Sequence, residues 1–512
     1  MVQIRAATMK LTIVLRHSHN AFLPEMVQRG MGFVAFAIAV VLALSAMLWM
    51  LISVSSGEKA LRRSLQILSL AITLTFFIQS SMVLPSSYDL ASSLGFGART
   101  SGLIIGSGFA ANAIGAILQV QCLTKPWIQS RNRWAIVLAA LGSVFLHLLF
   151  IVSVYATWSS RLRLAVIIVA RAGLGLLCTL SPAWLLAVRV TPEEELVPFS
   201  LAGSILCGVG IGAGPMLDAT LRWHLPDISE RGSHAAPAFC LAAVWVALTA
   251  AAFFLVPQHL TEESCDNMDA VANDSSAADK AHVSRLADME NKAGGNDGLV
   301  LEEPQISSRQ TRIWVHAAVI GMERALIVSA LEAASSLLLE IKYGFSRKDV
   351  GLAVGCTFVL GTPLMVCLGQ LQNHAKLSDV ALLCVLTLVT ALPALLFVQG
   401  VGSALASNVP GYWWILLADS LLFPTAYTAS GLAEGMLLQH SQVGTLFSAE
   451  NYTIVNAVLE DGVGRFVGPV LARWLIKQAD GQDAYALLQL GLCGLAFGTS
   501  LHLYHISHKC DS

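Results

Sequence analysis

Charged residues are scarce in this chain. Only 12% of its 512 residues are Asp, Glu, Lys or Arg, whereas soluble domains carry about 25%. Hydrophobic residues make up 55%, and the mean hydropathy is +0.67. The apolar residues form runs long enough to cross a bilayer as helices, which satisfy their own backbone hydrogen bonds. The composition excludes an ordinary soluble protein and predicts an all-α, multi-pass membrane protein in a lipid bilayer.

Other signals are absent as well. The net charge is −2 and no large basic region occurs, so nucleic-acid binding has no support. The ten cysteines form no C-x-x-C pair, which argues against a metal site or a disulfide framework. No G-x-x-x-x-G-K-[ST] phrase occurs, which disfavours a self-contained ATP pump. No nucleophile or metal constellation is visible. We therefore expect no enzyme and no cofactor.

The apolar runs divide the chain into two similar parts. We expect an N-terminal six-helix bundle at 64–256 and a C-terminal six-helix bundle at 312–505. Between them, 257–311 is expected to be a disordered linker, because 261–303 holds eleven acidic and three basic residues. The twelve spans are expected near 64–85, 100–119, 134–155, 164–188, 199–217, 237–256, 313–341, 349–371, 380–399, 411–432, 447–477 and 483–505.

Three segments lie outside the two bundles. Residues 1–30 form a basic N-terminal tail, either disordered or an organelle-targeting segment. Residues 31–55 are apolar and long enough for an extra N-terminal helix. This segment is either cleaved or retained in the mature protein, and its length favours a retained helix. Residues 506–512 are expected to be a C-terminal tail.

Two phrases occur twice at nearly the same offset. Gly208–Leu217 and Gly462–Leu471 both fit G-V-G-x-x-x-G-P-x-L, and their starts lie 254 residues apart. Gly102–Phe109 and Gly351–Phe358 both begin G-L-x-x-G, 249 residues apart. Repetition at a fixed offset indicates a duplicated architecture. Two pseudo-symmetric bundles are therefore expected.

The longer phrase supplies candidates for close packing or bending. Glycines one helical turn apart let another helix approach, and a proline removes a backbone hydrogen bond. Either tight static packing or a hinge between the halves would use such residues. The candidates are Gly208, Gly212, Gly214 and Pro215 in the first copy, and Gly464, Gly468 and Pro469 in the second.

The second copy differs from the first by carrying charge. Arg465 stands where the first copy has Ile211, and Glu460 and Asp461 precede it. Asp461 and Arg465 are four residues apart and can pair on one helical face, whereas Glu460 is expected about 100° around the helix. Intramembrane charges usually face the bundle interior and mark function. A structural salt bridge is one interpretation. A solute or proton site is the other, with Arg465 contacting an anion or carboxylate and one of the acids titrating.

Other polar residues inside the predicted spans extend the candidate set. Intramembrane charges at these places are costly and favour a functional interpretation. The further candidates for solute binding or proton coupling are Arg171, Glu332, Asp419 and Gln79.

Three local motifs resemble those of the major facilitator superfamily. Arg171–Gly175 is similar to its R-x-x-x-G signature, and Gly208–Pro215 is similar to its glycine-rich phrase ending in Gly-Pro. Gly369–Asn373 resembles its G-x-L-x-D loop, with Asn in place of Asp. The equivalent loop at 120–133 lacks both the glycine and the acid, which puts the usual gating contact in doubt. The resemblance implies twelve helices, of which one, four, five, seven, eight, ten and eleven line a central cavity. All the charged candidates and Gln79 lie on that set.

These observations favour a secondary active transporter. We expect it to move a small polar or anionic solute across the plasma membrane or an organelle membrane by alternating access, coupled to protons. An uncoupled facilitator is the alternative within transport, and a membrane receptor or scaffold is the alternative outside it. The expected partners are a small molecule or ion and the bilayer, with a monomeric protein.

Overall fold

The computed structural model describes most of the two predicted bundles. The described residues are 58–123, 132–177, 180–192, 195–225, 229–256, 308–375, 378–441, 449–478 and 480–508. The tail at 1–30, the expected extra helix at 31–55 and the linker as far as residue 307 lie outside these ranges. The first helix after the linker begins at Ser308, four residues before the predicted boundary.

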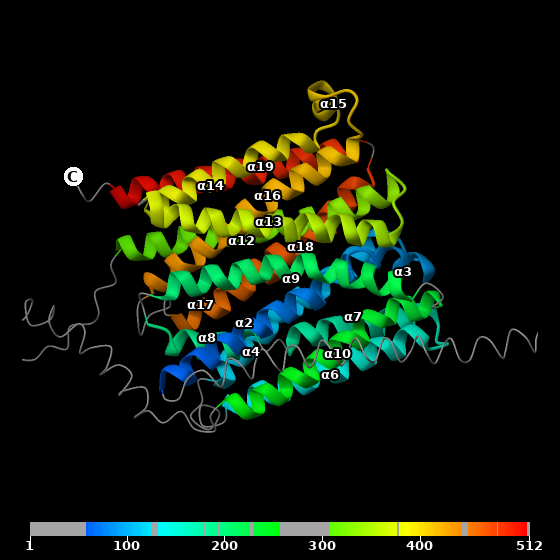
Figure 1. The fold of residues 1–512 in the computed structure, drawn as a ribbon, viewed down its shortest axis with the longest axis horizontal. Coiled ribbons are helices and arrows are strands. Elements are labelled where there is room, and N and C mark those ends of the chain that lie inside the picture. Colours follow the sequence, from blue (N-terminus) through cyan, green and yellow to red (C-terminus); the bar gives the residue numbers. More distant parts are fainter. Residues whose placement is uncertain are drawn as a thin grey trace, which may run out of the picture.

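The described chain consists of helices arranged as two groups (Figure 1). The N-terminal group comprises α2 (Glu58–Ser81), α3 (Ser87–Ser93), α4 (Ala98–Leu123), α6 (Asn132–Tyr155), α7 (Ser160–Leu176), α8 (Leu180–Val190), α9 (Leu196–His224) and α10 (Glu230–Leu255). The C-terminal group comprises α12 (Ser308–Ile341), α13 (Arg347–Ala375), α14 (Asp379–Ala394), η3 (Leu395–Phe397), α15 (Val401–Leu405), α16 (Gly411–Gln439), α17 (Ala449–Asn456), η4 (Ala457–Arg465), α18 (Phe466–Ile476) and α19 (Gly481–His508).

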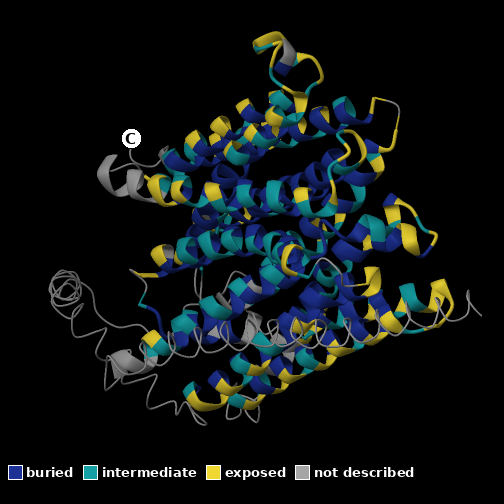
Figure 2. Cartoon of the chain, turned by 45° about the vertical axis from the view of Figure 1, so that its right-hand side comes forward, coloured by how far each residue is buried: buried dark blue, intermediate teal, exposed yellow. Residues whose placement is uncertain are grey.

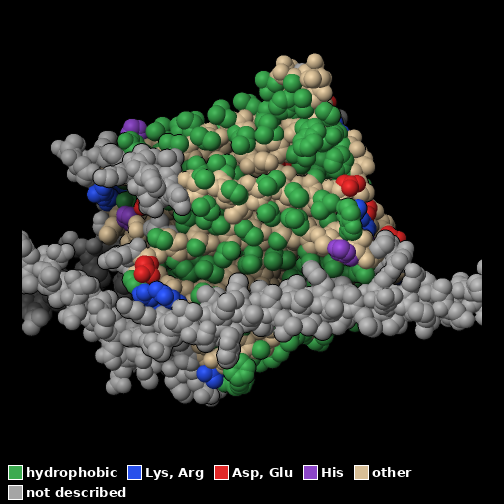
Figure 3. Space-filling view, viewed as in Figure 1, with side chains coloured by type: hydrophobic (Ala, Val, Ile, Leu, Met, Phe, Trp, Pro, Cys, Tyr) green, Lys and Arg blue, Asp and Glu red, His purple; other side chains and the backbone are tan. Residues whose placement is uncertain are grey.

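Ten helices in the described ranges are long and apolar enough to cross a membrane. The two remaining predicted spans are present as broken helices, α7 with α8 and α17 with η4 and α18. On the face drawn in Figure 3, hydrophobic side chains cover a broad middle band, and charged side chains gather towards the two ends of the helices. The prediction of an all-α fold with two six-helix bundles is confirmed.

The two broken spans each contain a proline close to the break. Pro182 lies in the first turn of α8, where its missing N–H costs no helical hydrogen bond. Pro469 lies in α18, and it leaves the carbonyl of Arg465 without the donor four residues later. The turns before it form the π-helix η4, in which the N–H of Phe466 bonds the carbonyl of Asp461, five residues earlier. In contrast, α9 continues as an α-helix through Pro215.

The duplicated phrases pack against one another crosswise between the halves. Gly102 and Gly106 of the first short phrase, on α4, face the second long phrase: a Cβ on Gly102 would lie 3.2 Å from the carbonyl oxygen of Pro469. The glycines of the second short phrase, on α13, face the first long phrase: a Cβ on Gly351 would lie 2.8 Å from the carbonyl oxygen of Pro215. Each repeat therefore supplies one side of two equivalent contacts, as expected for a pseudo-symmetric pair.

The same symmetry extends to contacts inside each half. The hydroxyl of Ser81 on α2 donates to the carbonyl of Gly210 at 3.2 Å, and that of Ser329 on α12 donates to the carbonyl of Gly464 at 3.1 Å. Four residues later in each phrase, Gly214 and Gly468 lie so close to Ser81 and Ser329, respectively, that a Cβ would not fit. The long phrase thus joins its own half to the opposite half.

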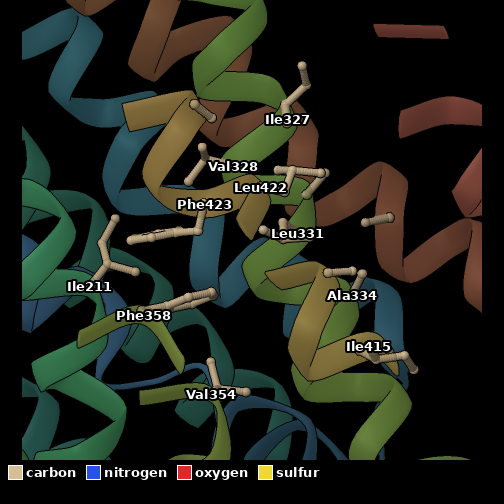
Figure 4. Packing of buried hydrophobic residues seen from close by; sticks show 14 of the residues in the cluster. Ile211, Ile327, Val328, Leu331, Ala334, Val354, Phe358, Ile415, Leu422 and Phe423 are labelled. Carbon is tan, nitrogen blue, oxygen red and sulfur yellow. The ribbon is translucent and has the colours of Figure 1, made fainter. Parts of the chain in front are cut away.

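Buried residues concentrate where the two halves meet, and exposed residues lie at the helix ends and on the outer helices (Figure 2). Part of this core is apolar. Ile211 of α9 lies beside Phe358 and Phe423 of the C-terminal half (Figure 4). The rings of Phe358 and Phe423 stack with centroids 4.1 Å apart. Apolar packing between the halves therefore surrounds the polar residues described next.

Candidate functional site

A pocket lies between the two halves and receives most of its polar lining from η4, α16 and α17. The N-terminal half contributes α2, α4, α8 and α9. The lining residues are Thr73, Phe77, Asn112, Trp184, Gly203, Ser204, Cys207, Tyr427, Ser430, Glu434, Tyr452, Asn456, Ala457, Glu460, Asp461 and Arg465. Three acids and one base stand among them. The predicted charged segment of the second long phrase is therefore part of this pocket.

Arg465 is held on several sides. Its Nε lies 3.2 Å from Oδ1 of Asp461, and the two side chains are 7% and 13% exposed. Its Nη1 donates to the hydroxyl of Tyr427 at 3.1 Å. The guanidinium carbon also lies 4.6 Å from the centroid of the Phe77 ring in the opposite half, a cation–π arrangement. The predicted i, i+4 pair is present, and it occupies much of the guanidinium that an anionic solute would use.

Asp461 also contacts the N-terminal half directly. Its Oδ2 accepts a hydrogen bond of 2.5 Å from Nδ2 of Asn112 on α4. Asn112 is 2% exposed, and its Oδ1 has no hydrogen-bond partner among the described residues. The carboxylate therefore links a cation of its own half to an amide of the other, and the amide leaves one acceptor free at the pocket.

Glu460 faces the same pocket as Asp461, contrary to the expectation that it points elsewhere. The wider turn of the π-helix replaces the 100° step on which that expectation depended. With its amide nitrogen turned towards the carboxylate, Asn456 donates to Oε1 of Glu460 at 2.8 Å. A second acid, Glu434 of α16, is hydrogen-bonded to the hydroxyl of Tyr452. Glu434 and Glu460 repel each other electrostatically, and neither forms an ion pair within the described ranges.

Glu332 lies next to this cluster without lining the pocket. It belongs to α12, is 5% exposed, and interacts electrostatically with Arg465. Its Oε1 has no hydrogen-bond partner in the described part of the chain. Glu332 is thus a further acid near the same guanidinium.

The remaining candidates lie away from the pocket lining. Arg171 donates to the backbone carbonyls of Gln79 at 2.6 Å and Ser80 at 3.0 Å. The side-chain oxygen of Gln79 accepts from the indole of Trp245 at 2.8 Å. In the C-terminal half, Oδ1 of Asp419 accepts from the hydroxyl of Ser335 at 2.9 Å. These contacts give Arg171 and Gln79 partners inside the N-terminal half, and their role in binding stays a prediction.

The two halves are joined at the end of the molecule that carries α3, opposite the end formed by α8 and α17 (Figure 1). Arg473 of α18 is fully buried and donates to Ser101 Oγ of α4 at 2.5 Å and to the carbonyl of Leu84 at 3.3 Å. Further contacts cross between the halves here: the Arg347–Asp89 ion pair, Arg347 Nη2 with His234 Nε2 at 2.9 Å, Lys477 Nζ donating to the Tyr88 hydroxyl at 3.3 Å, and Lys348 Nζ at 3.7 Å from the Trp223 ring centroid. We call this set of contacts the α3-end seal.

Several residues of the site escaped the sequence reasoning. Glu434 was missed because the tenth span was expected to end at residue 432, whereas α16 continues to Gln439. Asn112 and Arg473 both lie inside predicted spans, and a polar side chain within an apolar run was the available signal. Asn456 lies inside the predicted span at 447–477 and offered the same signal. Tyr452 lies closer to the start of that span, where polar and aromatic residues are common.

No family model and no curated protein matches the sequence. A POT family transporter in complex with a thioalcohol-conjugated peptide matches with a TM-score of 0.53 and 14% identity, over 86% of this chain and 96% of that one. The xylose transporter XylE from E. coli, in a partially occluded inward-open conformation, matches with a TM-score of 0.54 and 12% identity, over 85% and 99%. The chain has the major facilitator fold.

A second POT family transporter, in complex with 5-aminolevulinic acid, matches with a TM-score of 0.53 and 16% identity, over 87% of this chain and 96% of that one. Likenesses at these identities establish the fold alone. The major facilitator fold agrees with the motifs around Arg171 and the Gly-Pro phrase. The side chains of Gly369–Asn373 and the loop at 124–131 lie outside the described residues, so the expected loop contacts stay predictions.

Proposed function

We propose that the protein is a secondary active transporter that moves a small polar solute across a membrane by alternating access, coupled to protons. The observation that carries the proposal is the charged pocket between the two halves, together with the α3-end seal on one side of it. A pocket at the interface of two repeats, with one end closed, is the arrangement that rocking of one repeat against the other requires.

Glycine-rich contacts support movement between the halves. The α9–α13 and α4–α18 contacts are close and lack intervening side chains at Gly102, Gly351 and Gly355. Contacts of this kind allow helices to stay packed while they pivot.

Proton coupling is supported by the imbalance of charge around the pocket. Buried charges are costly unless they are paired, and one guanidinium cannot pair with all the neighbouring acids. Protons or a charged solute must balance the rest. The titratable and charged groups that face this site from the packed elements are Cys207, Glu332, Tyr427, Glu434, Tyr452, Glu460, Asp461 and Arg465.

The direct test of coupling is Asp461→Asn in proteoliposomes. Solutes that stabilise the purified protein against heat are found first, from a panel containing xylose, 5-aminolevulinic acid and a thioalcohol-conjugated peptide, the compounds named for the similar structures. Uptake is then measured with and without an inward proton gradient. We expect the wild type to respond to the gradient and Asp461→Asn to lose that response.

The outcomes separate the alternatives. Uptake that ignores the proton gradient in the wild type indicates an uncoupled facilitator. Stabilisation without uptake indicates a receptor, and neither effect across the panel indicates a scaffold. Glu323→Gln is the matched control, because Glu323 is a buried acid of α12 that does not line the pocket. If this control loses coupling as Asp461→Asn does, Asp461 has no specific role.

A further inference from the structure

The acids of the pocket outnumber its bases. Glu434, Glu460 and Asp461 line it, and Arg465 is the one lining residue with a basic side chain among those described. Asp461 already pairs with Arg465. Neither Glu434 nor Glu460 forms an ion pair among the described residues, although Glu460 interacts electrostatically with both Glu434 and Arg465. Two unpaired carboxylates in a confined site attract a positive group, and they disfavour an anion.

A second feature independently indicates a hydrogen-bond donor in the ligand. Oδ1 of Asn112 has no hydrogen-bond partner among the described residues, and its side chain is 2% exposed and lines the pocket. Its orientation is fixed, because Nδ2 of the same amide donates to Asp461. Leaving a buried acceptor unsatisfied costs about 1–3 kcal/mol. A ligand with N–H groups removes that cost, whereas a carboxylate does not.

The other side of the pocket offers an aromatic wall with one donor. Trp184 of α8 lines the pocket, is 7% exposed, and stacks on Phe199 with ring centroids 4.6 Å apart. Its indole N–H has no partner in the described part of the chain. This donor matches an acceptor in the ligand, such as a hydroxyl oxygen. The pocket is therefore acidic on the side of η4 and α16, and aromatic on the side of α8.

We propose that the transported solute is an organic cation bearing an ammonium group, which binds between Glu434, Glu460 and the Asn112 carbonyl. The proposal rests on the transport function proposed above and specifies its substrate class. It replaces the anion that the arginines suggested from the sequence, since Arg465 is paired and Arg171 lies elsewhere. Protons that neutralise the same carboxylates would compete with the cation, so the two would exchange.

The experiment uses two series that differ in charge at nearly constant size. Ethanolamine, ethylene glycol and glycolate form the small series, and tryptamine, tryptophol and indoleacetate form the aromatic series. Binding to the full-length protein in detergent is measured by calorimetry. We expect the amine of at least one series to bind about tenfold or more tightly than its neutral and anionic partners, the effect of one charge-assisted contact.

Two variants locate the site, and one serves as control. Glu460→Gln and Glu434→Gln should each weaken amine binding about tenfold and leave the neutral compounds unaffected. Glu323→Gln, outside the pocket, should leave amine binding unchanged. A size-exclusion profile for each protein identifies a variant that fails to fold. If one of the two glutamine variants fails to fold, amine binding to the other tests the location of the site.

The possible results also distinguish this proposal from the transport function. Tighter binding of a neutral or anionic compound, or no binding by either amine, overturns the cation assignment. Amine binding that both glutamine variants retain overturns the assignment of the site. Amine binding without amine flux in proteoliposomes would support the cation assignment and contradict the transport function. Flux of xylose without flux of either amine would support the transport function and contradict the cation assignment.

Discussion

The guanidinium of Arg473 donates to the hydroxyl of Ser101 at 2.5 Å, from the C-terminal half to the N-terminal half. The same guanidinium also donates to Ser336 of its own half at 3.1 Å and to the carbonyl of Leu84 in the other. It is fully buried at the α3 end. One side chain therefore connects two helices of the C-terminal half to two segments of the N-terminal half.

Arg473→Gln is expected to open the α3-end seal. Hydrogen bonds to charged groups contribute about 1.5–3 kcal/mol each, so losing those across the boundary should change the ratio of closed to open molecules about tenfold or more. Spin labels on the exposed residues Ser93 and Gln478 report the distance across this end. We expect a longer-distance population that the wild type lacks.

The control for this variant is Arg163→Gln. Arg163 donates to the carbonyls of Ser153 at 3.2 Å and Val154 at 2.9 Å, all within the N-terminal half. It therefore has similar bonds that do not cross the boundary. A distance distribution that changes equally in both variants would mean that Arg473 contributes general stability and no seal.

Gly355→Ala is expected to disturb the contact between α13 and α9. The new Cβ would lie 2.4 Å from Cγ of Met216 and 2.7 Å from the carbonyl oxygen of Gly212. Overpacking of this kind costs about 1–3 kcal/mol. Gly498→Ala on α19 is the control, because nothing lies within 4 Å of its Cβ, and its thermal unfolding temperature should stay the same or rise.

Two measurements on Gly355→Ala separate a pivot from static packing. If the contact only packs, thermal stability falls and transport per folded molecule stays near the wild-type value. If the halves pivot there, transport per folded molecule falls even at temperatures where the variant is fully folded. The pivot interpretation fails if flux recovers completely once corrected for the folded fraction.

Much of the fold was predictable from hydropathy and repetition. Spans longer than about 20 apolar residues indicate membrane helices, and the spacing between the copies of the long phrase indicated two related halves. Repetition also marks the residues that pack between them. It could not indicate which copy packs against which, because the crosswise contact between Gly102 and Pro469 links segments more than 360 residues apart.

The site was predictable only in part. The charges of the second phrase were evident from Asp461 and Arg465, because ionic side chains are rare in apolar spans. The π-helix η4 was not evident from the sequence, and its wider turn determines that Glu460 faces the pocket. Nor did the sequence show that the guanidinium of Arg171 binds carbonyls near the end of α2, whereas that of Arg465 lines the pocket. Both are arginines in predicted spans, and the acids beside Arg465 fit a structural salt bridge as well as a binding site.

Asp461→Asn is expected to destabilise the protein, and Asp461→Asn combined with Arg465→Gln is expected to restore part of that loss. Removing one partner of a buried pair leaves an uncompensated charge and costs about 3–5 kcal/mol. Removing both leaves two amides that can still bond Asn112 and Tyr427. Thermal unfolding of the two single variants and the double variant gives the coupling energy. Additive losses would mean that the two side chains do not act as a pair.

The same double variant distinguishes a structural pair from a working one. A purely structural salt bridge predicts that stability and coupled transport recover together. A pair that takes part in coupling predicts that stability recovers while the response to the proton gradient stays lost. Recovery of both would leave Glu434 and Glu460 as the remaining titratable candidates of the pocket.

Arg171→Met is expected to lower stability without changing the affinity of the folded protein. Arg171 donates to the carbonyls of Gln79 and Ser80, in the last turn of α2, which ends at Ser81. The last carbonyls of a helix lack partners within it, so Arg171 satisfies two of them. The methionine is similar in length and removes both bonds, and each unsatisfied carbonyl costs about 1–3 kcal/mol.

Arg465→Met provides the comparison, because Arg465 is also buried but lines the pocket. We expect the Kd of a bound amine to stay within about twofold of the wild type in Arg171→Met, since no charge in the pocket changes. In Arg465→Met, Asp461 loses its cation and joins the unpaired acids, so the amine should bind more tightly, by about tenfold for one added charge contact. A change in Kd for Arg171→Met as large as that for Arg465→Met would contradict this division and would return Arg171 to the binding site that the sequence suggested.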